Sequence, residues 1–80
     1  MITVHVRLFA TLLRFFPDLQ LGETMQVNLP DGATVGQLID RLNIPVEEIK
    51  IVFVNNIFRD MGYSLKNGDM VSIFPPVGGG

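Results

Sequence analysis

The sequence predicts an α+β fold in which a mixed sheet of four to five strands is covered on one face by one main helix. Apolar and polar residues alternate over residues 2–9 and 25–29, which is the period of half-buried strands. Residues 34–43 carry the single apolar stripe of an amphipathic helix. Residues 49–54 and 70–74 are rich in the branched and aromatic side chains typical of strands. Because one helix covers only one face, we expect the other face of the sheet to be at least partly open.

The first third of the chain contains two expected strands with a loop between them. Residues 2–9 form the first strand, and residues 10–16 suit one or two helical turns laid over the end of the sheet, stopped by Pro17. Residues 18–24 have no apolar period and are expected to be an irregular loop. Residues 25–29 then form the second strand. Since the intervening segment is short, we expect a meander rather than a crossover.

The main helix has a clear start and a clear end in the sequence. Thr34 suits the N-cap position, and Gln37, three residues later, completes a capping box. Residues 43–45 end the helix, because proline cannot continue it. A short turn follows, in which we expect Val46 to point inward. The apolar stripe of the helix consists of Val35, Leu38, Ile39 and Leu42.

In the second half of the chain the sequence predicts two further strands and, between them, a very short one. Residues 49–54 give the strongest strand signal, and the last part of this run is apolar on both faces. Residues 55–56 are both asparagine, which tolerates positive φ and favours a turn, so residues 57–59 suit a very short returning strand. Residues 67–69 form a second turn, and residues 70–74 form the last strand.

The composition excludes several classes of function. The chain has 80 residues, enough for one small domain, and no cysteine, which rules out disulfides, thiolate metal sites and thiol nucleophiles. A net charge of −2 with dispersed lysines and arginines disfavours nucleic-acid binding. No apolar run is long enough to cross a membrane and no signal peptide is visible, so we expect a cytoplasmic location. His5 has no second ligand at useful spacing, and no metal site is expected.

The last six residues form an unusual ending. Pro75 and Pro76 favour an extended backbone path, and the three glycines at residues 78–80 have no Cβ and so make a thin, flexible chain. We therefore divide the chain into a folded domain at residues 1–74 and a flexible tail at residues 75–80. A frayed terminus or a cloning scar is the alternative interpretation of such a tail.

Five segments along the chain carry a resemblance to known proteins. They are Leu8-Phe9-Ala10, Pro30-Asp31-Gly32-Ala33-Thr34-Val35, Val54-Asn55-Asn56, Leu65-Lys66-Asn67-Gly68-Asp69 and Phe74-Pro75-Pro76-Val77-Gly78-Gly79-Gly80. With the order of elements, these segments resemble the β-grasp, ubiquitin-like fold, and more narrowly the ThiS/MoaD family of sulfur carriers. The resemblance covers nearly all of the chain, and the ending is its most specific part.

The resemblance implies that the chain is a carrier and not an enzyme. In this family an E1-like adenylyltransferase of the MoeB/ThiF type adenylates the terminal carboxylate, here that of Gly80, and sulfur then replaces the adenylate to give a thiocarboxylate. The tail must enter a narrow channel, so Gly78 and Gly79, with Pro75, Pro76 and Val77, are expected to thread into the partner. No cofactor is expected to bind, because ATP and the sulfur donor, such as a cysteine desulfurase or a rhodanese, are used by the partner enzymes.

Of three destinations for the activated tail, the resemblance favours molybdopterin synthesis. The ending from Phe74 to Gly79 is similar to that of the small subunit of molybdopterin synthase, which implies the synthase large subunit (MoaE type) as partner and a role in molybdenum or tungsten cofactor synthesis. The carriers that deliver sulfur to a thiazole synthase in thiamine synthesis are an alternative. A ubiquitin-like modifier conjugated to lysines is another. An interaction or RNA-binding module with an inert tail would be a different class of protein.

Three phenylalanines are candidates for a docking surface. Phe9 and Phe74 fall on the nominally polar side of the first and last strands, which are neighbours in a β-grasp sheet. Phe58 lies just beyond the asparagine turn, at a position that resembles a family contact residue. We expect the three to form an exposed apolar patch at the base of the tail, where a partner would bind. The alternative is that some of them pack beneath the loop of residues 10–24.

Overall fold

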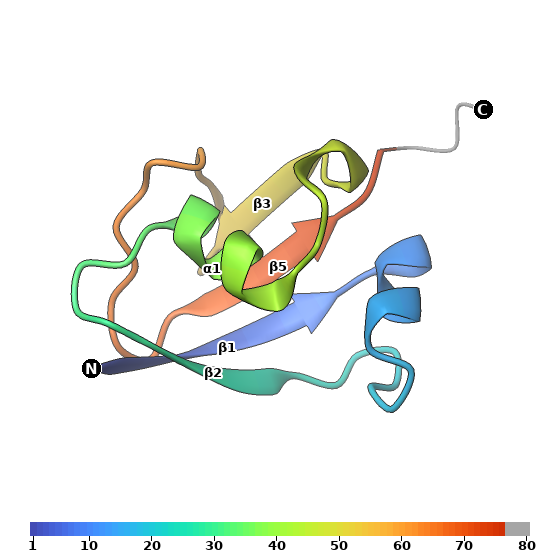
Figure 1. Ribbon diagram of the computed structural model, residues 1–80, viewed down its shortest axis with the longest axis horizontal. Helices are drawn as coiled ribbons and strands as arrows, with labels where there is room; N and C mark the ends of the chain where they lie inside the picture. The colour runs from blue at the N-terminus through green and yellow to red at the C-terminus, as the bar shows by residue number, and fades with distance from the viewer. Residues whose placement is uncertain (77–80) are drawn as a thin grey trace.

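The protein, seen here as a computed structural model that describes residues 1–76, folds into a five-stranded mixed sheet with one main helix (Figure 1). The predicted α+β architecture is confirmed, at the upper end of the expected strand number. The predicted tail residues Val77, Gly78, Gly79 and Gly80 lie outside the described residues. In chain order the elements are β1 (Ile2–Leu8), the 3-10 helix η1 (Ala10–Phe15), β2 (Met25–Leu29), α1 (Val35–Leu42), the 3-10 helix η2 (Val46–Glu48), β3 (Ile51–Val54), β4 (Ile57–Phe58) and β5 (Met70–Phe74).

The strand order β2-β1-β5-β3-β4 places the first and last strands side by side at the centre of the sheet. β1 and β5 run parallel, in a register that pairs His5 with Met70 and Leu8 with Ile73. β2 pairs antiparallel with β1, so the predicted meander is confirmed. β3 and β4 form an antiparallel hairpin on the other side of β5. The last strand therefore ends in the middle of the sheet and not at its edge.

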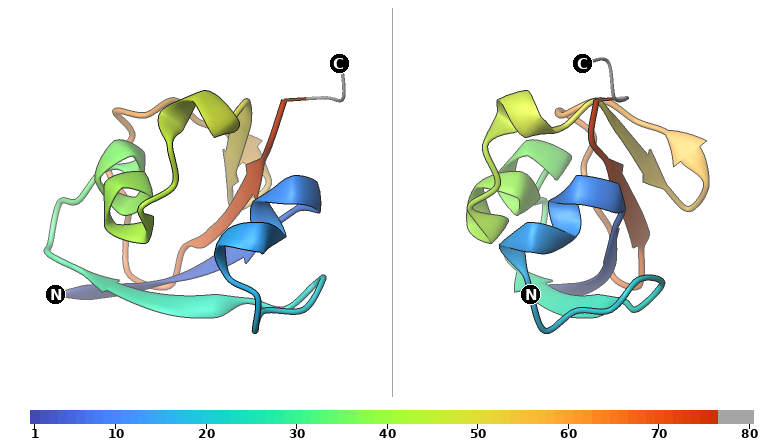
Figure 2. Two further views of the ribbon diagram at one scale, coloured as in Figure 1. Left: turned by 45° about the vertical axis from the view of Figure 1, so that its right-hand side comes forward. Right: turned by 90° about the vertical axis from the view of Figure 1, so that its right-hand side faces the viewer.

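The hydrophobic core lies between the sheet and α1. One face of the sheet is fully buried at alternate positions, including Val4, Val6 and Leu8 of β1 and Ile73 of β5. α1 covers this face with its predicted apolar stripe, all of which is buried. Figure 2 shows α1 and η2 on the same side of the sheet. We call the opposite side the outer face, because no helix of residues 1–76 covers it.

The ends of α1 are set by the residues that the sequence identifies. The Thr34 hydroxyl accepts a hydrogen bond from the Gln37 backbone N–H at 3.2 Å, and the Gln37 side chain accepts one from the Thr34 N–H at 2.8 Å. This reciprocal capping box satisfies two amide donors that have no partner within the helix. At the other end Asn43 adopts a left-handed conformation with φ of 59°, which stops the helix.

The turn after α1 differs from the sequence prediction at one residue. Val46 was expected to point inward, but 60% of its surface is exposed. Ile44, two residues earlier, is buried instead and closes this end of the core. Because η2 is a single 3-10 turn, it buries none of its own residues and leaves Val46 on its solvent side. The expectation for Val46 was wrong.

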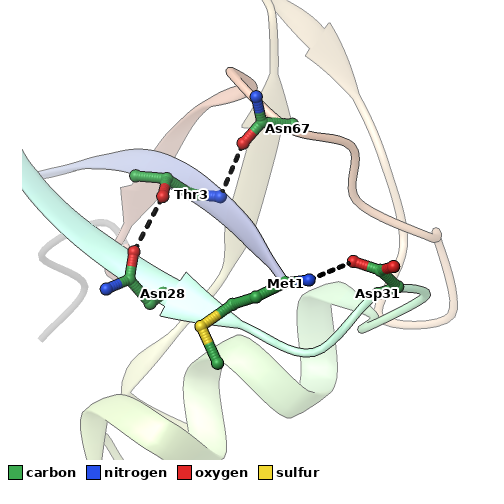
Figure 3. A network of polar contacts seen from close by, with 5 residues as sticks. All are labelled: Met1, Thr3, Asn28, Asp31 and Asn67. Carbon is green, nitrogen blue, oxygen red and sulfur yellow. Dashed lines mark hydrogen bonds and ion pairs between the residues drawn. The ribbon is translucent and has the colours of Figure 1, made fainter.

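Polar contacts fasten the start of β1 to its neighbours, at the end of the sheet far from the end of β5 (Figure 3). The Thr3 N–H donates to the Asn67 side-chain oxygen at 2.8 Å, and the Thr3 hydroxyl donates to the Asn28 side-chain oxygen at 2.7 Å. The N-terminal ammonium pairs with Asp31 at 2.7 Å. β1 is thus tied to β2 and to the turn before β5, which fixes the register of the central strands.

A second polar group joins the β3–β4 turn to the start of β5. Asn55 and Asn56 both have positive φ, as a two-residue type I′ hairpin turn requires. The buried carboxylate of Asp69 accepts hydrogen bonds from the Asn55 amide at 2.9 Å and from the Lys66 backbone N–H at 2.8 Å. The Asn55 side-chain oxygen accepts a bond from the Met70 N–H at 3.0 Å. Asp69 therefore holds two turns together at the point where the last strand begins.

We expect Asp69→Ala to lower the free energy of unfolding by about 2 kcal/mol, because it leaves two donors without their charged acceptor in a buried position. Urea denaturation monitored by circular dichroism measures this loss. Asp40→Ala, which removes an exposed carboxylate from α1, is the matched control and is expected to leave the stability nearly unchanged. An equal loss in both variants would contradict the role of Asp69.

Candidate functional site

The outer face of the sheet carries the side chains that alternate with the core residues. On β1 these are Thr3, His5 and Arg7, because Val4, Val6 and Leu8 point into the core. Phe9 continues this alternation beyond the strand, and its backbone N–H donates to the Ile73 carbonyl at 3.2 Å. Polar residues therefore occupy the end of the outer face where β1 starts, and aromatic residues occupy the end where β5 finishes.

Phe9 and Phe74 meet at the end of the two central strands. Their rings are stacked, with centroids 4.3 Å apart and planes inclined by 12°. The ring of Phe53, on β3, meets Phe74 edge-on at 5.7 Å and 89°. All three side chains are half-buried. Stacked and edge-to-face pairs stabilise each other beyond simple burial, so the three rings form one ordered unit.

Phe58 extends this unit to the edge strand. It pairs with Phe53 in the register of β3 and β4, and 62% of its surface is exposed. A large aromatic side chain in that position contributes little to the core and is available to another molecule. We call Phe9, Phe53, Phe58 and Phe74 together the aromatic patch.

A groove of about 580 Å³ adjoins the aromatic patch where the chain leaves β5. Its walls are almost wholly apolar. Beneath it, the pairing of β3 with β5 continues through a hydrogen bond from the Lys50 N–H to the Phe74 carbonyl at 2.8 Å. Pro75 and Pro76 form part of its wall, so the base of the tail and the patch belong to one surface. The lining residues are Phe9, Ala10, Thr11, Lys50, Ile51, Phe53, Phe74, Pro75 and Pro76.

The far wall of the groove depends on a backbone feature at the end of β1. Ala10 has φ of 53°, in the left-handed region that residues other than glycine seldom adopt. This turns the chain sharply after Phe9 into η1, whose Leu12 is completely buried. Because Leu12 holds η1 on the core, Ala10 and Thr11 are positioned beside the end of β5.

The described residues contain no arrangement suited to catalysis by metal ions. Within residues 1–76, no group of three or more His, Cys, Asp or Glu side chains lies close enough together to hold a metal ion. In the same part of the chain, no helix has the length and apolar character needed to span a membrane.

The structure brings together the three phenylalanines that the sequence singled out and adds a fourth. Phe9 and Phe74 are in direct contact, and Phe58 lies two strands away from Phe74 on the same face. The sequence analysis did not select Phe53. The signal was present, because the last part of residues 49–54 is apolar on both faces and Phe53 is the aromatic residue within it. Pro75 and Pro76 lie in the groove wall.

The fold of this chain is similar to that of several solved structures. A putative molybdopterin converting factor, subunit 1, from Pyrococcus furiosus superposes with a TM-score of 0.76 at 25% sequence identity, covering 96% of this chain and 100% of that chain. SAMP1 from Haloferax volcanii superposes with a TM-score of 0.74 at 26% identity, covering 98% of this chain and 99% of that chain.

The predicted ubiquitin-like β-grasp fold is confirmed. A ubiquitin from Caldiarchaeum subterraneum matches with a TM-score of 0.62, covering 99% of this chain and 98% of its own, and at 11% identity this likeness concerns the fold alone. No curated protein sequence matches this chain significantly. The model of the ThiS family, however, matches residues 6–80, nearly the whole sequence, and the protein therefore belongs to the ThiS family.

Proposed function

We propose that this protein is a sulfur carrier whose working group is the carboxylate of Gly80, with residues 75–80 as the tail that a partner enzyme receives. One observation carries the proposal: the apolar groove and aromatic patch lie at the point where the chain leaves β5. A partner that binds this surface has the start of the tail within its own contact area. Membership of the ThiS family supports the same function.

The chemistry assigns activation to the partner. A carboxylate is a poor electrophile. Its attack on the α-phosphate of ATP expels pyrophosphate and makes an acyl-adenylate, from which AMP leaves when sulfur attacks the carbonyl carbon. This intermediate must be kept from water, so the tail has to enter a closed site. A side chain on Gly79 or Gly80 would obstruct such a channel, which accounts for glycines at these positions. The carrier itself is a substrate in this scheme and not a catalyst.

We propose molybdopterin synthesis as the destination of the sulfur. The ending from Phe74 through Pro75 and Pro76 to the glycines supports this, as does the similarity to the Pyrococcus furiosus protein. The partners would then be an E1-like adenylyltransferase, which loads the carrier, and the large subunit of the synthase, which consumes the thiocarboxylate. Delivery to a thiazole synthase uses the same carrier chemistry and differs only in the last partner.

A second candidate function is that of a protein modifier. SAMP1 is a small archaeal modifier protein. Its similarity to this chain favours this function, because the two chains are 26% identical and superpose over nearly their whole lengths. Both functions begin with the same activated carboxylate. They diverge at the nucleophile, which is a sulfur donor for the carrier and a lysine amine for the modifier.

Intact mass spectrometry tests the carrier function. After incubation with the activating enzyme from the same genome, ATP, a persulfide donor and a thiol that reduces the acyl disulfide formed first, we expect the mass to rise by the difference between one sulfur and one oxygen. Deletion of residues 78–80 should abolish this shift and leave the unfolding curve unchanged, because the fold described over residues 1–76 does not contain them. If fragmentation placed the added sulfur anywhere other than on the C-terminal residue, the terminal carboxylate would not be the acceptor.

Proteomic digestion separates the modifier from the carrier. If the protein is a modifier, peptides from cell extracts will contain lysines joined by an isopeptide bond to the glycine tail. Deletion of residues 78–80 will remove these peptides. If it serves only as a carrier, such peptides will be absent while the thiocarboxylate is still found. The sulfur carrier is the expected result.

A further inference from the structure

The charges of this protein are distributed unevenly between the sheet and the rest of the chain. Arg7 is the only Lys, Arg, Asp or Glu residue within the five strands. All eight Asp and Glu residues lie in helices, turns and loops, although the net charge of the chain is −2. The outer face therefore combines a fixed positive charge with aromatic side chains and carries no strand carboxylate.

Arg7 lies in register with the aromatic patch. Its Cα partner on β5 is Ser72, which in turn pairs with Phe53, and Phe53 pairs with Phe58 on β4. These four residues form one row across the outer face. With strands about 4.8 Å apart, Arg7 and Phe53 are separated by roughly 10 Å, with only the small serine between them.

The Nε atom of Arg7 is covered and has no hydrogen-bond partner within residues 1–76. The two ion pairs of this part of the chain join the N-terminus to Asp31 and Arg14 to Glu48, so neither involves Arg7. A covered donor without an acceptor is unfavourable and rare in native structures.

Within residues 1–76 the Nε of Arg59 is covered and unpaired too, but that guanidinium lies over the ring of Tyr63. The Nε of Arg7 lies in the same row as Phe53 and Phe58, where another molecule can supply the acceptor.

A second cation, Lys50, lies in the wall of the groove, whereas Arg7 does not line it. Lys50 lines it together with Phe74 and the prolines, and it makes no ion pair with residues 1–76. Arg7 and Lys50 thus flank the stacked rings of Phe9 and Phe74 from the two sides of β5. A surface complementary to this face has apolar side chains at its centre and carboxylates beside them.

We propose that Arg7 determines which partner the outer face accepts, by pairing with a carboxylate on an otherwise apolar protein surface. This inference rests on the proposed function, in which that partner is the activating enzyme. The planar guanidinium of Arg7 can engage a carboxylate through two parallel hydrogen bonds, which gives the pair a defined geometry as well as opposite charges. The pair selects against basic partner surfaces and raises the rate of encounter with acidic ones.

The test is the affinity of the activating enzyme from the same genome for four forms of the protein, measured by isothermal titration at low and physiological salt. The forms are the wild type, Arg7→Glu, Arg7→Lys and Arg41→Glu. Arg41 is exposed on α1, away from the outer face, and its reversal changes the net charge as much as reversal of Arg7 does. Unfolding curves of all four establish that each is folded.

Arg7→Glu is expected to weaken binding about tenfold or more, with the larger effect at low salt, whereas Arg41→Glu stays within about twofold of the wild type. Arg7→Lys keeps the charge but not the two-pronged geometry, and is expected to lie between them. Equal affinities of the enzyme for Arg7→Glu and Arg41→Glu would overturn the inference. It would also be overturned if the wild type bound single-stranded RNA through Arg7 and did not bind the enzyme. If Arg7→Glu leaves binding unchanged while the wild type is thiocarboxylated, the inference about Arg7 fails and the proposed function stands. If the wild type is never thiocarboxylated, the proposed function itself fails.

Discussion

The parallel pairing of β1 and β5 is the contact on which the rest of this structure depends. It joins the first strand of the chain to the last and continues beyond both, through the hydrogen bond from the Phe9 N–H to the Ile73 carbonyl. A parallel pair needs a long connection, and here that connection contains β2, α1 and the β3–β4 hairpin. The whole domain is therefore built between two strands whose ends define the base of the tail.

This pairing gives the two faces of the sheet different tasks. The inner face is apolar at every alternate position and is covered by α1, so it supplies the stability of a small domain. The outer face carries the stack of Phe9 on Phe74, which a monomer has no need to expose. Because successive side chains of a strand point to opposite faces, neighbouring residues in the sequence have different roles. One packs in the core and the next lies on the outer face.

Much of the fold could be predicted from local patterns. The alternation of residues 2–9, the capping box at Thr34 and the turn at residues 55–56 are all determined by neighbours in the chain, and each was found where expected. Val46 was misplaced because an isolated apolar residue in a turn has no period that indicates its side. The tail at residues 77–80 is outside the described part of the chain, so its role remains a proposal.

The site itself depends on long-range register, which local patterns do not contain. Phe53 meets Phe74 because β3 and β5 pair with a particular offset, and Arg7 reaches the same row through a different pair of strands. A shift of one residue in either register would have moved these side chains to the core face. For this reason the sequence identified Phe9, Phe58 and Phe74 as candidates for a docking surface. It did not identify Phe53 and Arg7, which lie in the same row as Phe58.

The most direct measurement of the central claim, that the outer face binds the partner, compares two neighbouring residues of β4. Ile57 and Phe58 are both exposed, by 53% and 62%, but their side chains lie on opposite faces of the sheet, because Ile57 pairs with buried Val54 and Phe58 with Phe53. The affinity of the activating enzyme for Phe58→Ser is expected to fall about tenfold or more, and that for Ile57→Ser to stay near the wild-type value. Equal losses in the two variants, or a loss confined to Ile57→Ser, would contradict it.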